Sequence, residues 1–266
     1  MTILEKIIAN KKKEVETKYI HKPLEEIKKE ADFERGSLSM VDALTVKGSS
    51  GIIAEFKTMS PSKGILNATA DVEWVTRKYL EAGAAGLSVL TDSVFFGGSF
   101  DNLKMVRRKN ECPILQKDFI IDEYQIAEAY INGADVILLI AAVLDKKKIK
   151  LLAKVAKEYG MEVILEIHEK SEIDMLTGEV DIAGINNRNL RTFETSVDKS
   201  FSLVKHIPRD FIKISESGLY DADTIMKLKE AGFSGFLIGE QFMREPDPGE
   251  ACYNMIKQLS EREKYS

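Results

Sequence analysis

Charged side chains stand at the ends of several short apolar runs in this sequence. The run PILQKDF closes on Lys117 and Asp118, GIIAEFK places Glu55 two residues before Lys57, and EVILEIH carries Glu166 near its end. Lysine and glutamate side chains donate and accept protons, so such residues held close together are suited to general acid–base catalysis. Whether they can act together depends on the elements that carry them.

From residue 51 onward, short apolar runs alternate with longer amphipathic stretches. Runs that are apolar almost throughout are typical of strands buried on both faces of a parallel sheet. Eight strands are predicted, at residues 51–56, 86–90, 113–119, 135–140, 162–167, 182–186, 211–217 and 235–239. The segments that follow them predict helices at residues 71–83, 99–110, 122–134, 145–160, 171–178, 196–207, 221–232 and 247–261.

Eight βα units in succession predict an α/β fold of the (β/α)8 TIM barrel type. An open doubly wound sheet is the alternative, but the segment KTMSPSKG after the first strand lacks the glycine-rich GxGxxG loop of that fold. Residues 1–50 contain helical patterns at residues 2–19 and 23–32. We expect them to form a helical N-terminal extension packed on a barrel of residues 51–266, with a single domain overall.

Strand alternation predicts which polar side chains point into the barrel, whose active site is expected at the carboxyl ends of the strands. Glu55 and Lys57 share one face, and Lys117 is in phase with Leu115. Asp118 falls on the opposite face, toward the helices. We therefore expect Asp118 only to anchor the end of its strand.

The later strands add polar groups at the same end of the barrel. Glu166 closes the fifth strand, Asn186 and Arg188 are in phase after the sixth, and Glu216 and Ser217 close the seventh. Charges buried together are costly unless they are paired, so we expect the two lysines to pair with Glu55 and Glu166. An ion-pair network that only stabilises the barrel mouth is the alternative to an active site.

Glycines follow the last two strands and indicate an anion site. Gly218 comes after Ser217, and Gly239 precedes Glu240 and what reads as a short extra helix. In barrels of this type, these two loops and the start of such a helix form a phosphate site. We expect Glu240 to contribute its backbone N–H with its carboxylate turned away. Glycines that serve only as turns are the alternative.

His168 follows the fifth strand. Its usual pKa would suit proton transfer. A histidine that is exposed at the start of a loop is the commoner case, and it is the interpretation that we favour here.

Composition restricts the class of protein. The net charge is −5 with a pI near 5.5, so nothing in the balance favours nucleic acid as a partner. The two cysteines, Cys112 and Cys252, form no CxxC motif, and neither a disulfide framework nor a metal site is predicted. There is no secretory signal and no apolar run of the ~20 residues that a membrane span needs. We expect a soluble, cytoplasmic protein without a membrane partner.

The motifs IIAEFKTMSPSKG, PILQKDFIIDEYQI, GADVILLI, ILEIH, GINNRNL, SESG and LIGE together resemble the indole-3-glycerol phosphate synthase family of tryptophan biosynthesis. The resemblance covers essentially the whole chain, and the combination of E-x-K-x-x-SPS, KDF and GINNRNL in this order is specific. Two departures occur. Thr58 and Met59 stand where the family often has basic residues, and Gln116 stands where arginine or methionine is common.

The resemblance implies a carboxy-lyase that closes the pyrrole ring of 1-(2-carboxyphenylamino)-1-deoxyribulose 5-phosphate and releases carbon dioxide and water. Lys117 would be the general acid that protonates the ribulose carbonyl, which requires its cationic form; a carboxylate such as Glu55 favours that form. Glu166 would act in the dehydration as base, or as acid when protonated. The family's N-terminal region lies near the mouth of the active site and contributes to substrate binding.

The resemblance also assigns the binding residues. Lys57, with Arg188 and Ser60, would hold the substrate carboxylate, while Asn186 and Glu216 would orient hydroxyls or catalytic side chains. The remaining contacts would be with the phosphate (Ser217, Gly218, Gly239, Glu240) and with the anthranilate ring (Phe96, Phe119, Leu190). No cofactor or metal is implied, and we expect a monomer that binds a small phosphorylated substrate.

Two alternatives remain at this stage. A sugar-phosphate isomerase resembling phosphoribosylanthranilate isomerase would share the fold and the phosphate site, but it does not need the second lysine and Arg188. A barrel that binds a phosphorylated metabolite without converting it would not need Lys57, Lys117 and Glu166 together. A turnover assay separates these readings.

Overall fold

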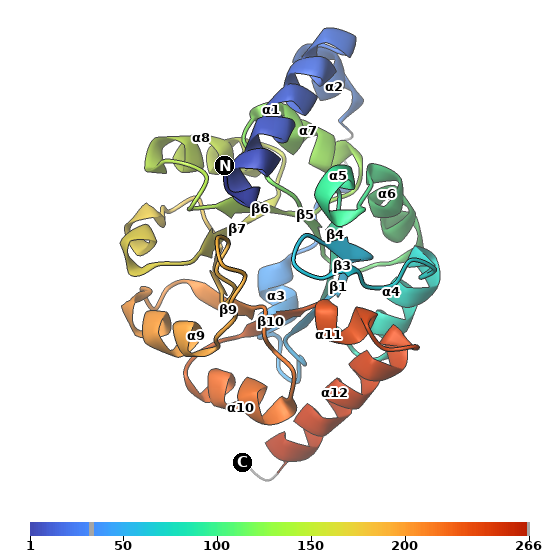
Figure 1. Ribbon diagram of the computed structural model, residues 1–266, viewed down its shortest axis with the longest axis vertical. Helices are drawn as coiled ribbons and strands as arrows, with labels where there is room; N and C mark the ends of the chain where they lie inside the picture. Colours follow the sequence, from blue (N-terminus) through green and yellow to red (C-terminus); the bar gives the residue numbers. More distant parts are fainter. Residues whose placement is uncertain (32–34, 265–266) are drawn as a thin grey trace.

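Eight parallel strands close into a barrel in the computed structural model, which describes residues 1–31 and 35–264 (Figure 1). Each strand pairs with its neighbours along the chain, and the last strand pairs with the first. The strands are β1 (Ile52–Phe56), β4 (Gly86–Leu90), β5 (Ile114–Lys117), β6 (Val136–Ile140), β7 (Glu162–Ile167), β8 (Ile182–Asn186), β9 (Ile212–Glu216) and β10 (Gly235–Ile238). The predicted TIM barrel is therefore confirmed.

Helices surround the barrel (Figure 1). Aspartate or serine side chains accept the first backbone N–H groups of most of them and so act as N-caps. The helices that follow the strands are α4 (Val72–Glu81), α6 (Phe100–Lys109), α7 (Glu123–Ile131), α8 (Lys146–Glu158), α9 (Asp198–Leu203), α10 (Ala222–Glu230) and α12 (Pro248–Glu263). The short extra helix expected after the eighth strand is α11 (Glu240–Met243).

Two predicted helices differ from the observed ones. Residues 171–178 were predicted as a helix, but the chain forms a 3₁₀ helix, η2 (Lys170–Met175), there. The Glu172 carboxylate accepts the backbone N–H groups of His168 and Glu169, at 2.6 and 3.1 Å, which tightens the chain into a short turn. The helix predicted at residues 196–207 is divided between α9 and a 3₁₀ turn, η3 (Val204–His206).

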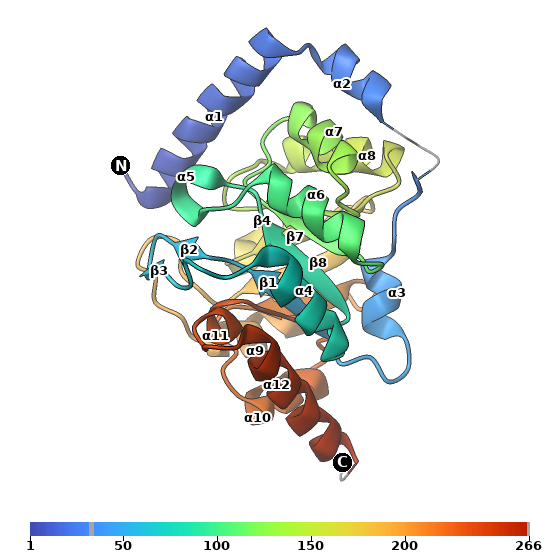
Figure 2. The ribbon, with the colours of Figure 1, turned by 90° about the vertical axis from the view of Figure 1, so that its right-hand side faces the viewer.

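The segment before the first strand contains the two predicted helices, α1 (Ile3–His21) and α2 (Leu24–Glu30), and a third, α3 (Met40–Thr45). Asp32, the last residue of the second helical pattern, lies outside the described residues. The amino-terminal part of α1 lies at one end of the barrel and α3 lies at the other (Figure 2). The division of the chain at residue 50 into an extension and a barrel stays a prediction.

Helix α3 closes the amino-terminal end of the barrel. Its N-cap is Ser39, and the Glu162 carboxylate of β7 accepts the backbone N–H groups of Met40 and Val41 at 2.7 and 3.1 Å. Met40 and Leu44 pack into the barrel interior. This end of the barrel is therefore filled, and the opposite end remains for a site.

Side chains alternate between two apolar layers. One layer fills the barrel interior, with Ile53, Leu115 and Ile164 among its members, and the other lies between the strands and the helices. Glu55, Lys117 and Glu166 each follow one of these interior residues by two positions, and all three line a pocket at the carboxyl end. No helix in the described part of the chain is long and apolar enough to cross a membrane.

Candidate active site

The carboxyl ends of the strands surround a pocket. Two short elements that the sequence did not predict contribute to its rim: α5 (Ser93–Phe96), and a hairpin of β2 (Met59–Ser60) and β3 (Gly64–Ile65). Every residue predicted for the site from the sequence lines this pocket: Glu55, Lys57, Ser60, Phe96, Lys117, Phe119, Glu166, Asn186, Arg188, Leu190, Glu216, Ser217, Gly218, Gly239 and Glu240.

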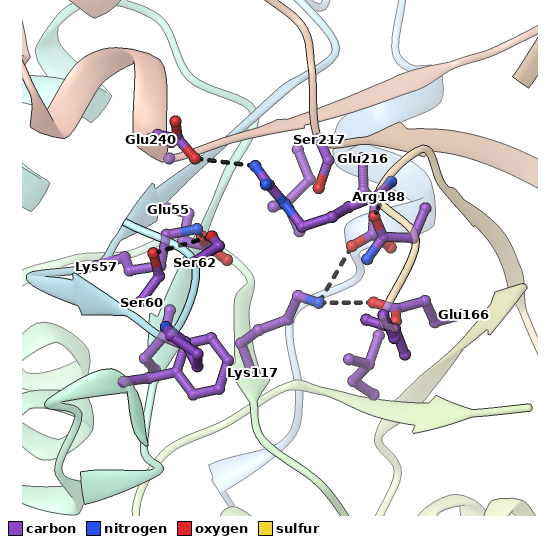
Figure 3. Close-up of a pocket in the computed structure, with 18 of the residues that line it drawn as sticks. Glu55, Lys57, Ser60, Ser62, Lys117, Glu166, Arg188, Glu216, Ser217 and Glu240 are labelled. Carbon is purple, nitrogen blue, oxygen red and sulfur yellow. Dashed lines mark hydrogen bonds and ion pairs between the residues drawn. The ribbon is translucent and has the colours of Figure 1, made fainter. Parts of the chain in front are cut away.

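Lys117 lies between two carboxylates. Its Nζ is 2.8 Å from Oε2 of Glu166 and 3.2 Å from Oε2 of Glu216 (Figure 3). Burial by itself would lower the pKa of Lys117, but the negative charges of Glu166, Glu216 and Glu55 outweigh that effect and raise it. The side chain is therefore an ammonium ion at neutral pH, and it carries a proton that it can donate.

Glu166 is ionised in this arrangement. Burial by itself would raise its pKa, but the Lys117 ammonium and His168 outweigh that effect and lower it. Glu166 and Lys117 are thus a carboxylate and an ammonium in direct contact, as expected from the sequence. Such a pair supplies both a base and an acid at one place.

Glu216 differs from Glu166 although both contact Lys117. Burial raises the pKa of Glu216 to about 7. The negative charges of Glu166 and Glu55 also raise this pKa, whereas the positive charge of Lys117 lowers it. Gly184 on β8 makes room for this carboxyl, since a Cβ at that position would lie 2.6 Å from Oε1 of Glu216. That oxygen accepts no hydrogen bond from the described residues, so it is available to a hydroxyl in the pocket.

A second pair lies at the end of β1. Nζ of Lys57 is 2.6 Å from Oε1 of Glu55, and the hydroxyl of Ser88 donates to the other oxygen of Glu55 at 3.4 Å. Both lysines predicted to need a carboxylate partner therefore have one. Lys57 remains partly exposed and faces the pocket together with Ser60 and Ser62 (Figure 3).

The Glu240 carboxylate faces Arg188, so the expectation that it turns away is wrong. Nη2 of Arg188 donates to Oε2 of Glu240 at 2.9 Å, and Nη1 donates to the carbonyl of Phe193 at 3.3 Å. Glu240 is the first residue of α11, and its side chain is drawn to the cation on the neighbouring loop. Sequence alternation could not show this contact, because it joins the loop after β8 to the first residue of α11 and not two strands.

The loop after β9 contains two consecutive residues in the left-handed region, Ser217 with φ 69° and Gly218 with φ 74°. For a residue with a side chain this conformation costs about 1–2 kcal/mol. Nδ2 of Asn187 donates to the carbonyl of Ser217 at 2.9 Å, and Oδ1 of Asn187 accepts from the hydroxyl of Ser200 at 2.8 Å. Asn187 was not predicted for the site. It is out of phase with Asn186, and its side chain holds the loop from behind.

Aromatic and aliphatic side chains form the apolar wall of the pocket. The rings of Phe96, on α5, and Phe119, after β5, have centroids 5.8 Å apart. Ile3, Leu4 and Ile7 of α1 line the same pocket. The family resemblance places this region near the mouth of the site, and the structure identifies these three residues of the apolar stripe as the ones that line the pocket.

His168 is buried, and the expectation of an exposed loop residue is wrong. It is 8% exposed, and its Nε2 lies 3.2 Å from Oε1 of Glu166. The η2 turn explains the difference, because the Glu172 carboxylate binds the backbone N–H of His168 and keeps this residue next to the strand end. His168 therefore contributes to the electrostatic environment of Glu166.

Within residues 1–31 and 35–264, no group of three or more His, Cys, Asp or Glu side chains is placed to hold a metal ion. Cys112 and Cys252 are both free and buried. Burial raises the pKa of each thiol to about 12, so both are protonated at neutral pH.

A family model described as indole-3-glycerol phosphate synthase matches residues 4–255. The indole-3-glycerol phosphate synthase of Bacteroides thetaiotaomicron is 47% identical over 257 residues, covering 97% of this chain and 98% of that protein. That of a Polaromonas species is 44% identical over 258 residues, covering 96% and 98%. Among solved structures, 3-hexulose-6-phosphate synthase from Salmonella typhimurium matches with a TM-score of 0.62 at 13% identity, covering 79% of this chain and 99% of that one. This last likeness shows the fold alone.

Proposed function

The chain belongs to the indole-3-glycerol phosphate synthase family, and on that premise we propose how the residues around Lys117 perform the reaction of this carboxy-lyase. The substrate is 1-(2-carboxyphenylamino)-1-deoxyribulose 5-phosphate, and the products are indole-3-glycerol phosphate, carbon dioxide and water. The observation that carries the proposal is the Lys117 ammonium in contact with Glu166 and Glu216 inside the pocket.

Ring closure needs an acid at the keto group. The ring carbon that bears the carboxylate attacks the keto carbon of the ribulose chain, and the electron pair of the C=O bond moves to oxygen. Lys117 gives that oxygen its proton. Because the surrounding carboxylates raise the pKa of Lys117, the proton is present at neutral pH.

The substrate supplies the electron sink for the loss of carbon dioxide. After ring closure the aryl nitrogen carries a positive charge as an iminium. Carbon dioxide leaves, and its bonding pair restores the aromatic ring and neutralises the nitrogen. This step needs no further acid or base. The substrate's carboxylate carries no proton, so the overall reaction takes up one proton, with which Lys117 is recharged from solvent.

Dehydration needs a base and then an acid, and Glu166 is suited to both roles. Its lowered pKa leaves it ionised, so it can take a proton from the carbon next to nitrogen. The electron pair of that C–H bond forms the C=C bond of the pyrrole ring as the bond to the hydroxyl group formed in the first step breaks. The hydroxyl receives the proton from the protonated form of Glu166 and leaves as water. Glu216 and Asn186 orient the hydroxyls of the chain, and Glu55 supports Lys57.

The two ends of the substrate are both anionic, and we assign each of them its own set of residues in the pocket. Lys57, Arg188 and Ser60 hold the carboxylate, to which a guanidinium can donate two hydrogen bonds. The phosphate lies at the loops after β9 and β10, and the aryl ring packs on the apolar wall. The residues proposed for these last two contacts are Ser217, Gly218, Gly239 and Glu240, and Phe96, Phe119 and Leu190.

We further propose a cytoplasmic monomer. We also propose that it has no nucleic-acid partner, which agrees with the net charge of −5.

Incubation of the purified protein with the carboxyphenylamino substrate tests the function, because the indole product is followed by its absorbance and fluorescence. The parent protein is expected to turn over many equivalents, and a Lys117→Ala variant should be strongly impaired. A parent protein that binds the substrate without forming an indole would contradict the proposal.

A further inference from the structure

Lys11 of helix α1 is a buried lysine that the reaction does not use. It is only 4% exposed, although the two lysines that follow it, Lys12 and Lys13, are exposed. Its Nζ contacts three carboxylates, at 2.7 Å for Glu14, 3.2 Å for Asp92 and 3.0 Å for Asp118. Asp92 and Asp118 belong to the barrel, so this contact joins the N-terminal helix to the ends of β4 and β5.

Each of the two aspartates also holds a part of the apolar wall. Oδ1 of Asp92 accepts the backbone N–H of Phe95 at 2.7 Å and caps α5, the helix that ends at Phe96. Oδ1 of Asp118 accepts the backbone N–H of Phe119 at 2.7 Å, and the hydroxyl of Thr91 donates to its other oxygen. The charge cluster of Lys11, Asp92 and Asp118 is therefore directly behind the two phenylalanines.

We propose that Lys11 is a positioning residue for the aryl ring of the substrate, because its ion pairs hold α1 and the loops that carry Phe96 and Phe119 in one arrangement. The apolar residues Ile3, Leu4 and Ile7 of the same helix then complete the wall. The inference rests on the proposed function, since it assumes that an aryl substrate occupies this side of the pocket.

Burial and charge support this role. Asp92 is fully buried and Asp118 is nearly so, and buried charges are costly unless a partner of opposite sign is present. Burial by itself would lower the pKa of Lys11, but Asp118, Glu14 and Asp92 outweigh that effect and raise it, so the lysine is a cation at any pH of interest. The cluster holds its geometry only while that cation is in place.

The cluster is separated from the phosphate end of the proposed site. The ammonium of Lys117 is held by Glu166 and Glu216, neither of which contacts Lys11. The phosphate loops follow β9 and β10, and β1 lies between those strands and β4 in the barrel order. A change at Lys11 should therefore affect the aryl end of the substrate and not its phosphate end.

Lys11→Met, which keeps the length of the side chain and removes its charge, tests the inference. Lys13→Met, an exposed lysine of the same helix, is the matched control. We expect the KM of Lys11→Met to rise about tenfold to a hundredfold with little change in kcat, since apolar contacts in a pocket are worth roughly this much and a group that acts only through binding changes KM. The inhibition constant of glycerol 3-phosphate, which can occupy only the phosphate end, should stay at the parent value.

Three results for Lys11→Met would overturn the inference. They are a KM equal to that of Lys13→Met, a loss of kcat at unchanged KM, and an inhibition constant of glycerol 3-phosphate that rises together with KM. If Lys11→Met unfolds, the triple variant with Asp92→Asn and Asp118→Asn removes the unpaired charges and keeps the cap of α5. Its stability should recover while its KM stays high, and recovery of both would contradict the role of the ion pairs. A parent protein without turnover would instead refute the proposed function.

Discussion

Arg188 and Glu240 form an ion pair inside the pocket, with Nη2 and Oε2 2.9 Å apart. The guanidinium that we propose for the substrate carboxylate is therefore already partnered by a carboxylate of the protein. A substrate carboxylate at Arg188 would bind beside Glu240, to guanidinium N–H groups that this ion pair does not use. This makes the loop after β8 and the start of α11 parts of the same recognition site.

Arg188→Ala tests the assignment of the carboxylate. We expect weaker substrate binding, and we expect an analogue that lacks the carboxylate to bind almost equally to the variant and the parent, because only the carboxylated compound uses the guanidinium. Inhibition constants for both compounds measure the difference. The same preference for the carboxylated compound in both proteins would show that Arg188 is not its partner.

Lys117→Ala should lower kcat by ~10²–10⁴, the range for the loss of a general acid. Lys147→Ala, at an exposed position of α8, is the control and should leave turnover unchanged. Steady-state kinetics and circular dichroism measure activity and folding. Near-normal kcat in a folded Lys117→Ala variant would exclude this lysine as the proton donor.

Glu166→Gln keeps the shape of the side chain and removes its ability to take a proton. We expect kcat to fall with a modest change in KM, because dehydration comes after the substrate has bound. Ring closure and decarboxylation need only Lys117, so single-turnover experiments should still detect carbon dioxide release. A variant that binds more weakly but turns over normally would make Glu166 a binding residue.

Glu216 should make stability depend on pH between about 5 and 7. Its pKa is raised to about 7 in the folded protein, against 4.5 for an ordinary glutamate. The folded state therefore holds more protons than the unfolded state in this window, and the free energy of unfolding falls as pH rises through it. Glu216→Gln removes this loss, so its stability relative to the parent should increase from pH 5 to pH 7.

Urea denaturation at several pH values measures the difference in the free energy of unfolding between Glu216→Gln and the parent protein. Above pH 8 the difference should be constant, because the carboxyl is then ionised in both states. A difference that is flat from pH 5 to pH 8 would mean that Glu216 does not titrate in this range.

Deletion of residues 1–22 removes α1 and leaves α3 in place. We expect a protein that folds cooperatively and whose KM rises more than its kcat falls, because α1 contributes apolar side chains to the pocket, whereas the Lys117 ammonium is held by Glu166 and Glu216. Circular dichroism and steady-state kinetics measure both effects. Unchanged kinetics would show that α1 is remote from the bound substrate.

A longer deletion, of residues 1–40, serves as the contrast. It also removes Ser39 and Met40, which cap α3 and fill the amino-terminal end of the barrel. The expected result is a clear loss of stability in addition to the kinetic effect. Equal stability of the two truncated proteins would show that α3 does not depend on its cap or on Met40.

The local sequence pattern determined the barrel and the inward orientation of the groups that we propose for catalysis. Strand alternation has a period of two, so Lys117 follows Leu115 and Glu166 follows Ile164 on the same face whatever the rest of the chain does. The strands β4, β7 and β8 begin and end at the predicted residues. The need to pair buried charges likewise predicted a partner for each lysine before any distance was known.

Only the tertiary structure decided which groups meet across the molecule. Lys117 contacts Glu216 as well as Glu166, Glu240 turns to Arg188, and His168 lies beside Glu166. These contacts depend on loop conformation and on closure of the barrel. Neither of these leaves a repeating pattern in the sequence, unlike the alternation of side chains along a strand.

The contact of Lys11 with Asp118 is the clearest case, since the two residues are far apart in the chain and belong to different elements. A lysine within a run of lysines on an amphipathic helix predicts a solvated side chain. Its burial follows from where α1 crosses the barrel, because that crossing places two carboxylates under one turn of the helix. The sequence contained all the residues of the cluster, and packing alone brought them within 3.2 Å of one ammonium group.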